Sequence, residues 1–368
     1  MDSKGAPRFR PHESTDLFMK QVTVEYTAAG QCPAFLAALN FWTNGDLELQ
    51  RTIQQLLGLS ITGVTREQIF IILHGPASTG KSTLIEIVNA IFGNYATALA
   101  SDTFLLRKHS APEERKVAAL VGARFASASE TEAGGVLAEN LIKMLTGEDK
   151  TAARFLYREK EDYMPEAKIW LRTNNLPDIR GIDGAIWRRV IIVPFGNIVP
   201  EKAKDVQLKD KLHRELSGIL KWMVDGYLDY AKHGFYKAPV ILKAIAAYRK
   251  EQDVLERFFE EKCEFGPTFT VGKAIVHSSF SDWCETNHLR GMRSQLFHDQ
   301  LVTRFADRIK EDRAQTEKRE RVWLGVRTKM SVFEAKPVAA KVFEVPKAPS
   351  TTTTRKLPTP APLPKEKF

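Results

Sequence analysis

The 368-residue sequence contains few cysteines and no long apolar run, which argues against a disulfide-rich protein and against a membrane-spanning one. Its cysteines, Cys32, Cys263 and Cys284, are too few and too widely spaced for a disulfide framework. No apolar run approaches the roughly 18 residues that cross a bilayer. The N-terminus also lacks the apolar segment of a signal peptide; it reads MDSKGAPRFRPHESTD. We therefore expect a reduced, cytoplasmic protein that has no membrane partner.

The composition is that of a globular protein with a polar, basic extension. Hydrophobic residues make up 43% and charged residues 27%, which excludes a mostly disordered or fibrous chain. The formal net charge is +9, and residues 335–368 contribute +5 of it, with seven Lys or Arg against two Glu. The same stretch holds seven of the 18 prolines. We expect a disordered basic tail over residues 334–368, which is either a solvated extension or a weak nucleic-acid-binding arm.

The remaining sequence divides by its hydrophobic patterns. Residues 66–200 alternate short apolar runs with helical patterns, which is typical of an α/β fold with a parallel sheet. Helical patterns precede this stretch over 1–65 and follow it over 201–264. A smaller unit at 265–333 combines helical stretches with a terminal strand. The sequence therefore predicts a central α/β domain flanked by helices, followed by a separate small domain.

The strongest motif is a G-x-x-x-x-G-K-S match at Gly75–Ser82. We expect a buried strand at Ile69–Leu73 before it and a helix at Thr83–Phe92 after it. In that context the glycines let backbone N–H groups surround phosphates at a helix N-terminus. Lys81 is expected to reach the β- and γ-phosphates, and the Ser82 hydroxyl to bind Mg²⁺. The motif predicts a nucleoside triphosphate site with these residues: Gly75, Pro76, Ala77, Ser78, Thr79, Gly80, Lys81, Ser82 and Thr83.

Three later motifs carry polar residues at the ends of apolar stretches. Glu130 and Glu132 follow a strand-like run and are candidates for holding metal-bound water and activating the attacking water. Asn174 ends another strand, where an amide can sense the γ-phosphate. Arg188 and Arg189 precede a further strand and can act as an arginine finger. Taken singly, each motif has a structural alternative: an exposed acid pair, a turn cap or a solvated strand edge.

Taken in this order, the motifs resemble those of superfamily 3 helicases, and more closely the phage, plasmid and poxvirus primase–helicase group of AAA+ ATPases. The resemblance spans roughly residues 15–330. The matching stretches are 56–63, 75–83, 129–131, 142–149, 153–157, 173–177 and 187–189. One departure is Thr79, which stands where the group usually has Asn. The resemblance implies an AAA+-like P-loop NTPase core at 66–200, and flanking regions in this order: a helical collar (1–65), a helical lid region (201–264) and a winged-helix-like DNA-binding domain (265–333).

The resemblance also implies roles for individual residues. Lys81 is the catalytic phosphate ligand, and Glu130 is the Walker B acid that binds Mg²⁺ together with Ser82. Asn174 is the sensor amide, and Arg189 is the arginine finger that acts across a subunit interface, with Arg188 as its alternative. The implied cofactors are ATP and Mg²⁺.

The group's DNA-translocating hairpin corresponds to residues 149–163, for which we expect Arg154, Arg158 and Lys160 to contact DNA. The expected turn is the charged stretch Arg158–Asp162, and the alternative is a solvated hairpin with no DNA contact. The winged-helix-like domain adds a predicted basic helical surface. Its residues are Arg290, Arg293, Arg304, Arg308, Lys310 and Arg313. Interleaved acidic residues leave a mixed solvated face as the alternative.

Together these features predict an ATP-dependent, ring-forming DNA helicase, expected as a hexamer, for replication of a phage, plasmid or integrated element. Its expected partner is single-stranded or forked DNA in the host cytoplasm. About 65 residues precede the first strand, so we expect no priming activity. Either the primase or polymerase is a separate polypeptide partner, or the gene is truncated or degraded. Two alternatives are an ATP-dependent initiator or loader without processive unwinding, and a metabolite or polynucleotide kinase using the same loop.

Overall fold

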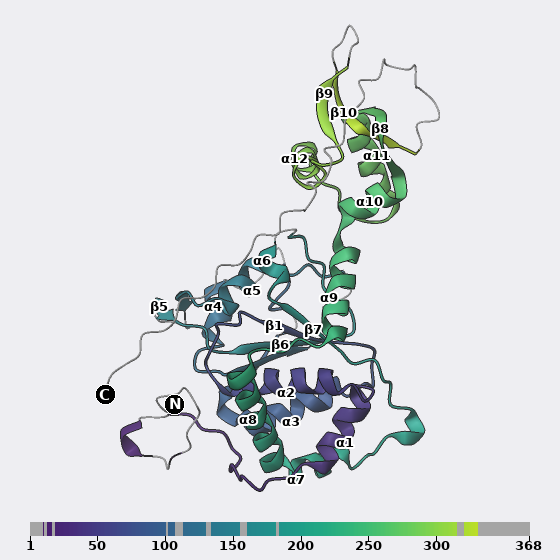
Figure 1. Ribbon diagram of the computed structural model, residues 1–368. Helices are drawn as coiled ribbons and strands as arrows, with labels where there is room; N and C mark the ends of the chain where they lie inside the picture. The colour runs from purple at the N-terminus through teal and green to yellow at the C-terminus, as the bar shows by residue number, and fades with distance from the viewer. Residues whose placement is uncertain are drawn as a thin grey trace, which may run out of the picture. The chain divides into compact units, whose positions relative to one another are not determined.

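The computed structural model describes residues 10, 13–16, 19–100, 102–106, 113–129, 134–154, 160–181, 184–314 and 320–329 (Figure 1). The chain divides into two units, Met1–Asp253 and Val254–Phe368, each with its own internal contacts. The tail expected over 334–368 lies outside the described residues, as do Glu130 and Arg158. In the described parts of the chain, no helix is both long and apolar enough to cross a membrane.

A five-stranded parallel sheet forms the centre of the first unit, as predicted. The strand order is β2-β3-β6-β1-β7, and every pairing is parallel. The strands are β1 (Phe70–His74), β2 (Ala96–Leu99), β3 (Phe125–Ser129), β6 (Lys168–Thr173) and β7 (Val190–Pro194). Most of their residues are buried, which is expected for a parallel sheet covered by helices on both faces. The carboxyl ends of the strands therefore meet along one edge, where the predicted phosphate loop also begins.

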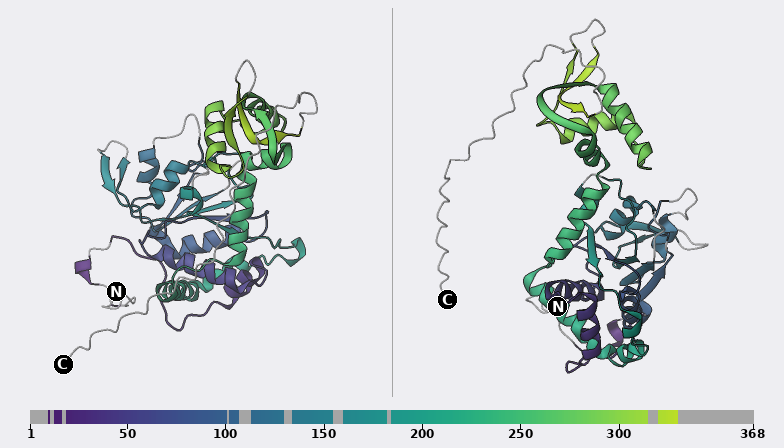
Figure 2. Two further views of the ribbon diagram at one scale, coloured as in Figure 1. Left: turned by 45° about the horizontal axis from the view of Figure 1, so that its top comes forward. Right: turned by 90° about the vertical axis from the view of Figure 1, so that its right-hand side faces the viewer.

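Helices cover both faces of this sheet (Figure 1, Figure 2). Alternate residues of β1 point to opposite faces, so Ile71 and Leu73 join one hydrophobic core while Phe70 and Ile72 join the other. The first core contains α1 (Pro33–Trp42), α2 (Leu47–Ile61), α3 (Lys81–Phe92), α7 (Leu208–Arg214) and α8 (Leu216–His233). The other face carries α4 (Glu113–Ala118), α5 (Glu139–Thr146) and α6 (Gly184–Trp187), while α9 (Pro239–Gln252) contributes to both cores. The described part of the unit also contains three single-turn 3₁₀ helices: η1 (Ser14–Asp16), η2 (Gly93–Tyr95) and η3 (Glu201–Ala203).

The N-terminal helices pack directly on those that follow the sheet. Helices α2 and α8 approach each other at two glycines. A Cβ on Gly58 would lie 2.4 Å from the Tyr227 nitrogen, and one on Gly226 would lie 2.2 Å from the Gln54 carbonyl oxygen. Arg51 Nε also donates to a carboxylate oxygen of Asp229 at 2.8 Å, which holds the pKa of Asp229 well below its usual value. Helices α1 and α2 of the expected collar and helices α7 and α8 of the expected lid region thus share one hydrophobic core.

A short antiparallel hairpin, β4 (Thr151–Arg154) and β5 (Lys160–Tyr163), lies in the predicted translocating segment. Its strands are shifted relative to the prediction, since Lys160 belongs to the returning strand and not to the turn. The reason is burial: Ala153 is 1% exposed and Tyr163 is 8% exposed, and both join the core on the α5 side of the large sheet. These inward residues set the strand register.

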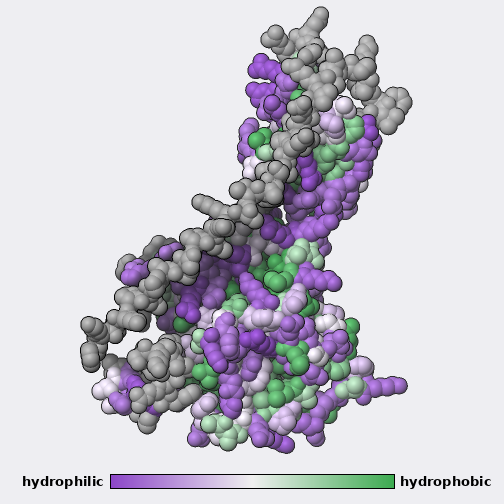
Figure 3. All heavy atoms as spheres, viewed as in Figure 1, coloured by the Kyte–Doolittle hydropathy of each residue, from purple (hydrophilic) through white to green (hydrophobic). Residues whose placement is uncertain are grey.

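The second unit has the element order helix, strand, helix, helix, strand, strand. These are α10 (Val254–Lys262), β8 (Cys263–Gly272), α11 (Lys273–Thr286), α12 (Ser294–Arg304), β9 (Lys310–Arg313) and β10 (Arg321–Thr328). The strands form an antiparallel sheet in the order β8-β10-β9. Aromatic side chains dominate its core, among them Phe258, Phe280, Phe297 and Trp323. The part of this unit that is coloured in Figure 3 combines hydrophilic residues with smaller hydrophobic patches.

Helix α10 belongs to this second core, whereas the sequence pattern places residues 254–264 with the lid region. Phe258 is fully buried against the rings of Phe280 and Trp283, at centroid distances of 5.3 and 5.8 Å. The amphipathic pattern indicates a helix but does not reveal which core the helix joins.

All three cysteines are free and buried, as expected for a chain without a disulfide framework. Burial raises the pKa of Cys32 to about 11 and that of Cys263 to about 12. Both side chains therefore behave as packed thiols.

Candidate nucleotide site

The predicted phosphate loop connects β1 to α3, and two of its glycines are required by its geometry. Gly75 has a φ of +154°, and a Cβ there would lie 1.9 Å from the Phe195 carbonyl oxygen. Gly80 has a φ of +93°, and a Cβ there would lie 2.2 Å from Trp42 Nε1. The loop is also held from outside, because the Val199 N–H donates to the Ser78 carbonyl at 2.9 Å. The close packing of Phe195 and Trp42 and the hydrogen bond from Val199 therefore hold the loop in this conformation.

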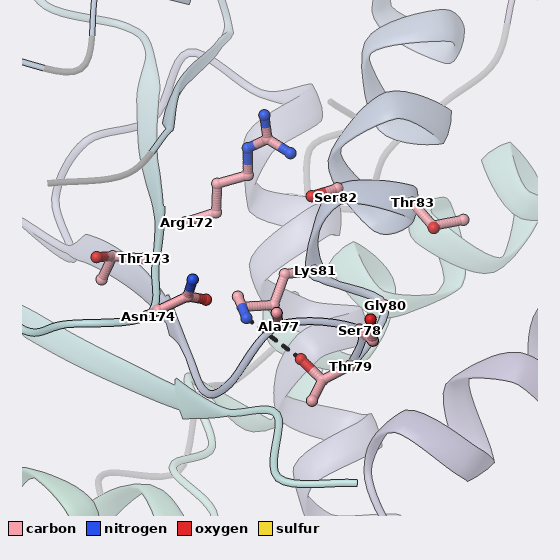
Figure 4. Close-up of a pocket in the computed structure, with 10 residues that line it drawn as sticks. All are labelled: Ala77, Ser78, Thr79, Gly80, Lys81, Ser82, Thr83, Arg172, Thr173 and Asn174. Atoms are coloured by element: carbon pink, nitrogen blue, oxygen red, sulfur yellow. Dashed lines mark hydrogen bonds between the residues drawn. The ribbon is translucent and has the colours of Figure 1, made fainter. Parts of the chain in front are cut away.

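Lys81, the first residue of α3, is 7% exposed, and its ammonium group lies inside the loop. Its Nζ donates to the carbonyl oxygens of Gly75 and Pro76, both at 2.6 Å, and lies 3.3 Å from Thr79 Oγ1 (Figure 4). Thr79 is itself buried, and its hydroxyl donates to the Pro76 carbonyl at 3.0 Å. The Thr79 hydroxyl thus stabilises the loop by an internal hydrogen bond. This is the position at which superfamily 3 helicases of the primase–helicase group usually have Asn.

A pocket of about 200 Å³ lies between this loop and the end of β6 (Figure 4). Its lining brings Lys81, Ser82 and Asn174 together, three of the predicted site residues. The lining residues are Ala77, Ser78, Thr79, Gly80, Lys81, Ser82, Thr83, Arg172, Thr173 and Asn174. Two cationic side chains and the N-terminus of α3 meet here, and each of these attracts an anion. The pocket therefore has the electrostatics of a polyphosphate site.

Asn174 lines the pocket while its neighbour makes the turn. Thr173 Oγ1 donates to the Asn175 carbonyl at 2.6 Å and accepts from the Asn175 N–H at 3.2 Å. The turn that was the structural alternative for this motif is thus formed by Thr173, and the Asn174 amide is presented to the pocket.

Arg172 and Thr173 line the pocket and His74 lies close to it, although none of the three is a predicted site residue. Arg172 lines the pocket from β6, although the apolar pattern of that strand offers no sign of its role. His74, at the end of β1, pairs in register with Thr173. Burial is the main cause that lowers the His74 pKa, and the nearby Lys81 charge lowers it further, while a hydrogen bond with the Asn174 backbone opposes both. His74 thus interacts with Asn174 and Lys81 of the pocket without lining it, and its environment favours the neutral imidazole.

The acidic partner of this site is only partly described. Strand β3 ends at Ser129, which pairs in register with Arg172 of β6. Glu130, the predicted Walker B acid and magnesium ligand, lies outside the described residues. Within the described ranges, no cluster of three or more His, Cys, Asp or Glu side chains could hold a metal ion.

The two arginines after α6 differ sharply in environment. Arg189 is 7% exposed, and its guanidinium donates to Thr146 Oγ1 at 3.0 Å and to the Ala185 carbonyl at 2.6 Å. Arg188 is exposed and donates to Gln68 Oε1 at 3.1 Å. Arg189 is thus hydrogen-bonded within its own protomer, and its action across a subunit interface stays a prediction. Both arginines lie in the turn between α6 and β7, and the two hydrogen bonds of its guanidinium account for the burial of Arg189.

The predicted DNA contacts are only partly described. Arg154 and Lys160 lie directly opposite each other in the β4–β5 register, while Arg158 is among the residues that are not described. In the second unit the expected basic helical surface is divided. Arg304 pairs with Glu256 at 3.1 Å, and Lys310 and Arg313 belong to strand β9 and not to a helix. The charges of this unit are therefore mixed over its surface.

Comparison with known proteins relates the chain to viral proteins that are named as helicases or primases. A family described as "Family of unknown function (DUF5906)" matches residues 73–189, which include the loop and both arginines. The chain is 25% identical over 265 residues to "Putative helicase L207/L206" of Acanthamoeba polyphaga mimivirus, and 27% identical over 258 residues to "Putative helicase 022R" of Frog virus 3. It is 22% identical over 276 residues to "Putative primase C962R" of African swine fever virus.

These matches cover 66%, 63% and 66% of this chain but only 27%, 26% and 27% of the relatives. The chain thus spans about a quarter of the length of the curated proteins it matches. Among solved structures, two of the NrS-1 C terminal region are similar, with TM-scores of 0.55 and 0.51 at 12% and 13% identity. Each similarity covers 83% of this chain and 78% of the other. The structural likeness supports the fold, and the named viral proteins are distant homologues from large DNA viruses.

Proposed function

We propose that this chain is the ATP-hydrolysing motor of a superfamily 3 DNA helicase that acts in replication. The observation that carries the proposal is the pocket in which Lys81 and Ser82 of the loop face Asn174 of the sensor strand. A phosphate loop alone serves many reactions. A polar amide at the end of the adjacent strand adds a group that responds to the terminal phosphate, which suits a motor.

The residues of the pocket fit a triphosphate with Mg²⁺. Backbone N–H groups at the start of α3 and the Lys81 ammonium supply fixed positive charge for the β- and γ-phosphates. Ser82 offers a hydroxyl ligand for Mg²⁺, which neutralises phosphate charge when bound. Glu130 is the proposed general base, and Asn174 orients the terminal phosphate.

For a ring, preferably a hexamer, we propose Arg188 as the residue that completes the site of the neighbouring subunit. The support is its exposure, in contrast to the inward hydrogen bonds of Arg189 to Thr146 and Ala185. Arg189 then acts as a positioning residue that anchors the segment before β7. The exposed arginine lies outside the buried network that anchors its neighbour, so it can be presented across an interface.

The β4–β5 hairpin is the proposed grip on single-stranded DNA. Its supporting feature is the cross-strand pair Arg154 and Lys160, which sets two cationic residue types at the same level of the hairpin. Such cations follow phosphates without reading bases. The second unit, whose element order is that expected of a winged helix, is a proposed additional DNA contact.

The test is unwinding of a forked duplex by the purified chain with ATP and Mg²⁺, beside ATP hydrolysis with and without single-stranded DNA. DNA-stimulated hydrolysis together with strand separation supports the helicase. Stimulated hydrolysis without separation identifies an initiator or loader. A chain that does not hydrolyse ATP under any of these conditions contradicts the proposal.

A further inference from the structure

Arg172 is a cationic residue of the pocket that none of the sequence motifs includes. It is the penultimate residue of β6, and it lines the pocket with Lys81, Ser82 and Asn174. In Figure 4 its side chain leaves the strand toward the helix that starts at Lys81, and the guanidinium lies on the side of Ser82. The arginine thus lines the pocket between the sensor strand and the start of α3.

The alternation of side chains along β6 explains this direction. Residues two apart share a face of a strand, so Arg172 lies on the same face as Trp170. Trp170 is fully buried in the core that includes α3, while Ile169 and Leu171 belong to the opposite core. Arg172 therefore lies on the face of β6 that faces α3, near the carboxyl end of the strand and close to the start of α3.

The sheet register places Arg172 between two functional strands. It pairs with Leu73 of β1, the strand that leads into the phosphate loop. On its other side it pairs with Ser129 of β3, the strand that precedes Glu130. An arginine on the central strand is therefore held at a defined level by hydrogen-bonded neighbours on both sides.

We propose that Arg172 contacts the γ-phosphate of the triphosphate bound in its own subunit, so that the pocket discriminates ATP from ADP. This inference rests on the proposed function of the site. A guanidinium keeps its charge at every physiological pH and presents a rigid fork of donors that matches phosphate oxygens. ADP has no γ-phosphate, so the Arg172 guanidinium has no phosphate oxygens to contact when ADP is bound. Arg172 thereby responds to the γ-phosphate bound in its own subunit, whereas an arginine finger responds to the nucleotide bound in the neighbouring subunit.

The experiment measures dissociation constants for ATP and for ADP, each with Mg²⁺, by calorimetric titration of the full chain. The variants are Arg172→Gln and Arg172→Lys, with Arg180→Gln as a matched control, because Arg180 is exposed and follows the same strand. We expect Arg172→Gln to weaken ATP binding roughly tenfold to a hundredfold, and ADP binding less than about threefold. Arg172→Lys should recover part of the ATP affinity, and Arg180→Gln should match the wild type.

A different set of results would overturn the inference while leaving the site intact. In that case the wild type binds both nucleotides, Lys81→Ala impairs both, and Arg172→Gln leaves the ratio of ATP to ADP affinity unchanged. A wild-type chain that binds neither nucleotide would contradict the proposed function and this inference with it. If Arg172→Gln fails to fold by circular dichroism, the Lys variant decides: a selective loss for ATP supports the contact, and an unchanged ratio rejects it.

Discussion

The indole of Trp42 lies directly against Gly80, so that a Cβ at Gly80 would fall 2.2 Å from Trp42 Nε1. Trp42 is 2% exposed and is the last residue of α1, and its ring also lies 6.3 Å from that of Phe195. The N-terminal helical layer therefore contacts the phosphate loop itself. This contact explains why the loop needs glycine at this position in addition to its left-handed φ of +93°.

The first prediction concerns this contact. Gly80→Ala should destabilise the chain more than Gly234→Ala. Both glycines have positive φ, but a Cβ at Gly80 would clash with Trp42, whereas nothing lies within 4 Å of a Cβ at Gly234. The difference should be about 1–3 kcal/mol, the usual cost of overpacking. Urea unfolding of both variants measures it. Equal losses would show that the indole moves aside without cost.

The second prediction separates the two arginines. Arg189→Ala should lower the free energy of unfolding by about 1–3 kcal/mol, because it leaves the buried Thr146 hydroxyl and the Ala185 carbonyl without this donor. Arg188→Ala should unfold like the wild type, since its side chain is exposed. Urea titrations of the two variants provide the comparison, and similar losses in both would argue against distinct roles.

A third prediction tests whether Arg188 acts across an interface. Arg188→Ala and Lys81→Ala chains should each hydrolyse ATP poorly, for different reasons. Mixed in one assembly, they should regain part of the activity, because some interfaces then pair an intact loop with an intact Arg188. Verified mixed assemblies without any recovery would place the completing group in the same subunit.

The fourth prediction concerns the hairpin. Lys160→Ala should weaken binding of single-stranded DNA without sequence bias, and it should flatten the salt dependence by about 0.7 in log–log slope for each phosphate that the lysine no longer neutralises. Lys202→Ala, at an exposed lysine of η3, is the control and should leave the slope unchanged. Fluorescence anisotropy at several salt concentrations gives both slopes. A Lys160→Ala slope equal to that of the wild type would remove this hairpin as the DNA grip.

The fifth prediction is a pH dependence from His74. Burial, more than the nearby Lys81, lowers its pKa in the folded chain below the ordinary 6.5, while a hydrogen bond with the Asn174 backbone and, more weakly, Glu251 act in the opposite direction. Neutral His74 therefore favours folding above pH 6.5, and this contribution is lost as the pH falls through the lowered folded-state pKa. His74→Gln should lose less stability than the wild type between about pH 7 and pH 5, whereas exposed His213→Gln should behave as the wild type. Urea unfolding at the two pH values checks this difference.

The local features of the fold could be predicted because they depend on short sequence patterns. The apolar strand before the loop, the helix after it and the parallel sheet all follow from the periodicity and from Gly75 and Gly80. The gathering of Lys81, Ser82 and Asn174 follows from the same topology, since parallel strands end at one edge of a sheet. These elements needed no knowledge of long-range packing.

The remaining features depend on contacts between distant segments. In the sequence, Arg172 is only an interruption of an apolar strand, and its role depends on which face of the sheet it occupies. The inward turn of Arg189 depends on Thr146, which lies 43 residues earlier in the chain. The assignment of α10 to the second core depends on partners such as Phe280. Charge and spacing alone could not separate such residues from solvated ones.

Single-turnover unwinding of a forked DNA duplex tests the central claim most directly, with wild-type chain compared with Lys81→Ala. The account predicts that the wild type separates the strands only with ATP and Mg²⁺, and that Lys81→Ala retains its fold and its DNA binding but separates nothing. Removing the ammonium leaves the pocket without the charge that stabilises the transferring phosphate. Strand separation by Lys81→Ala at the wild-type rate would contradict the account.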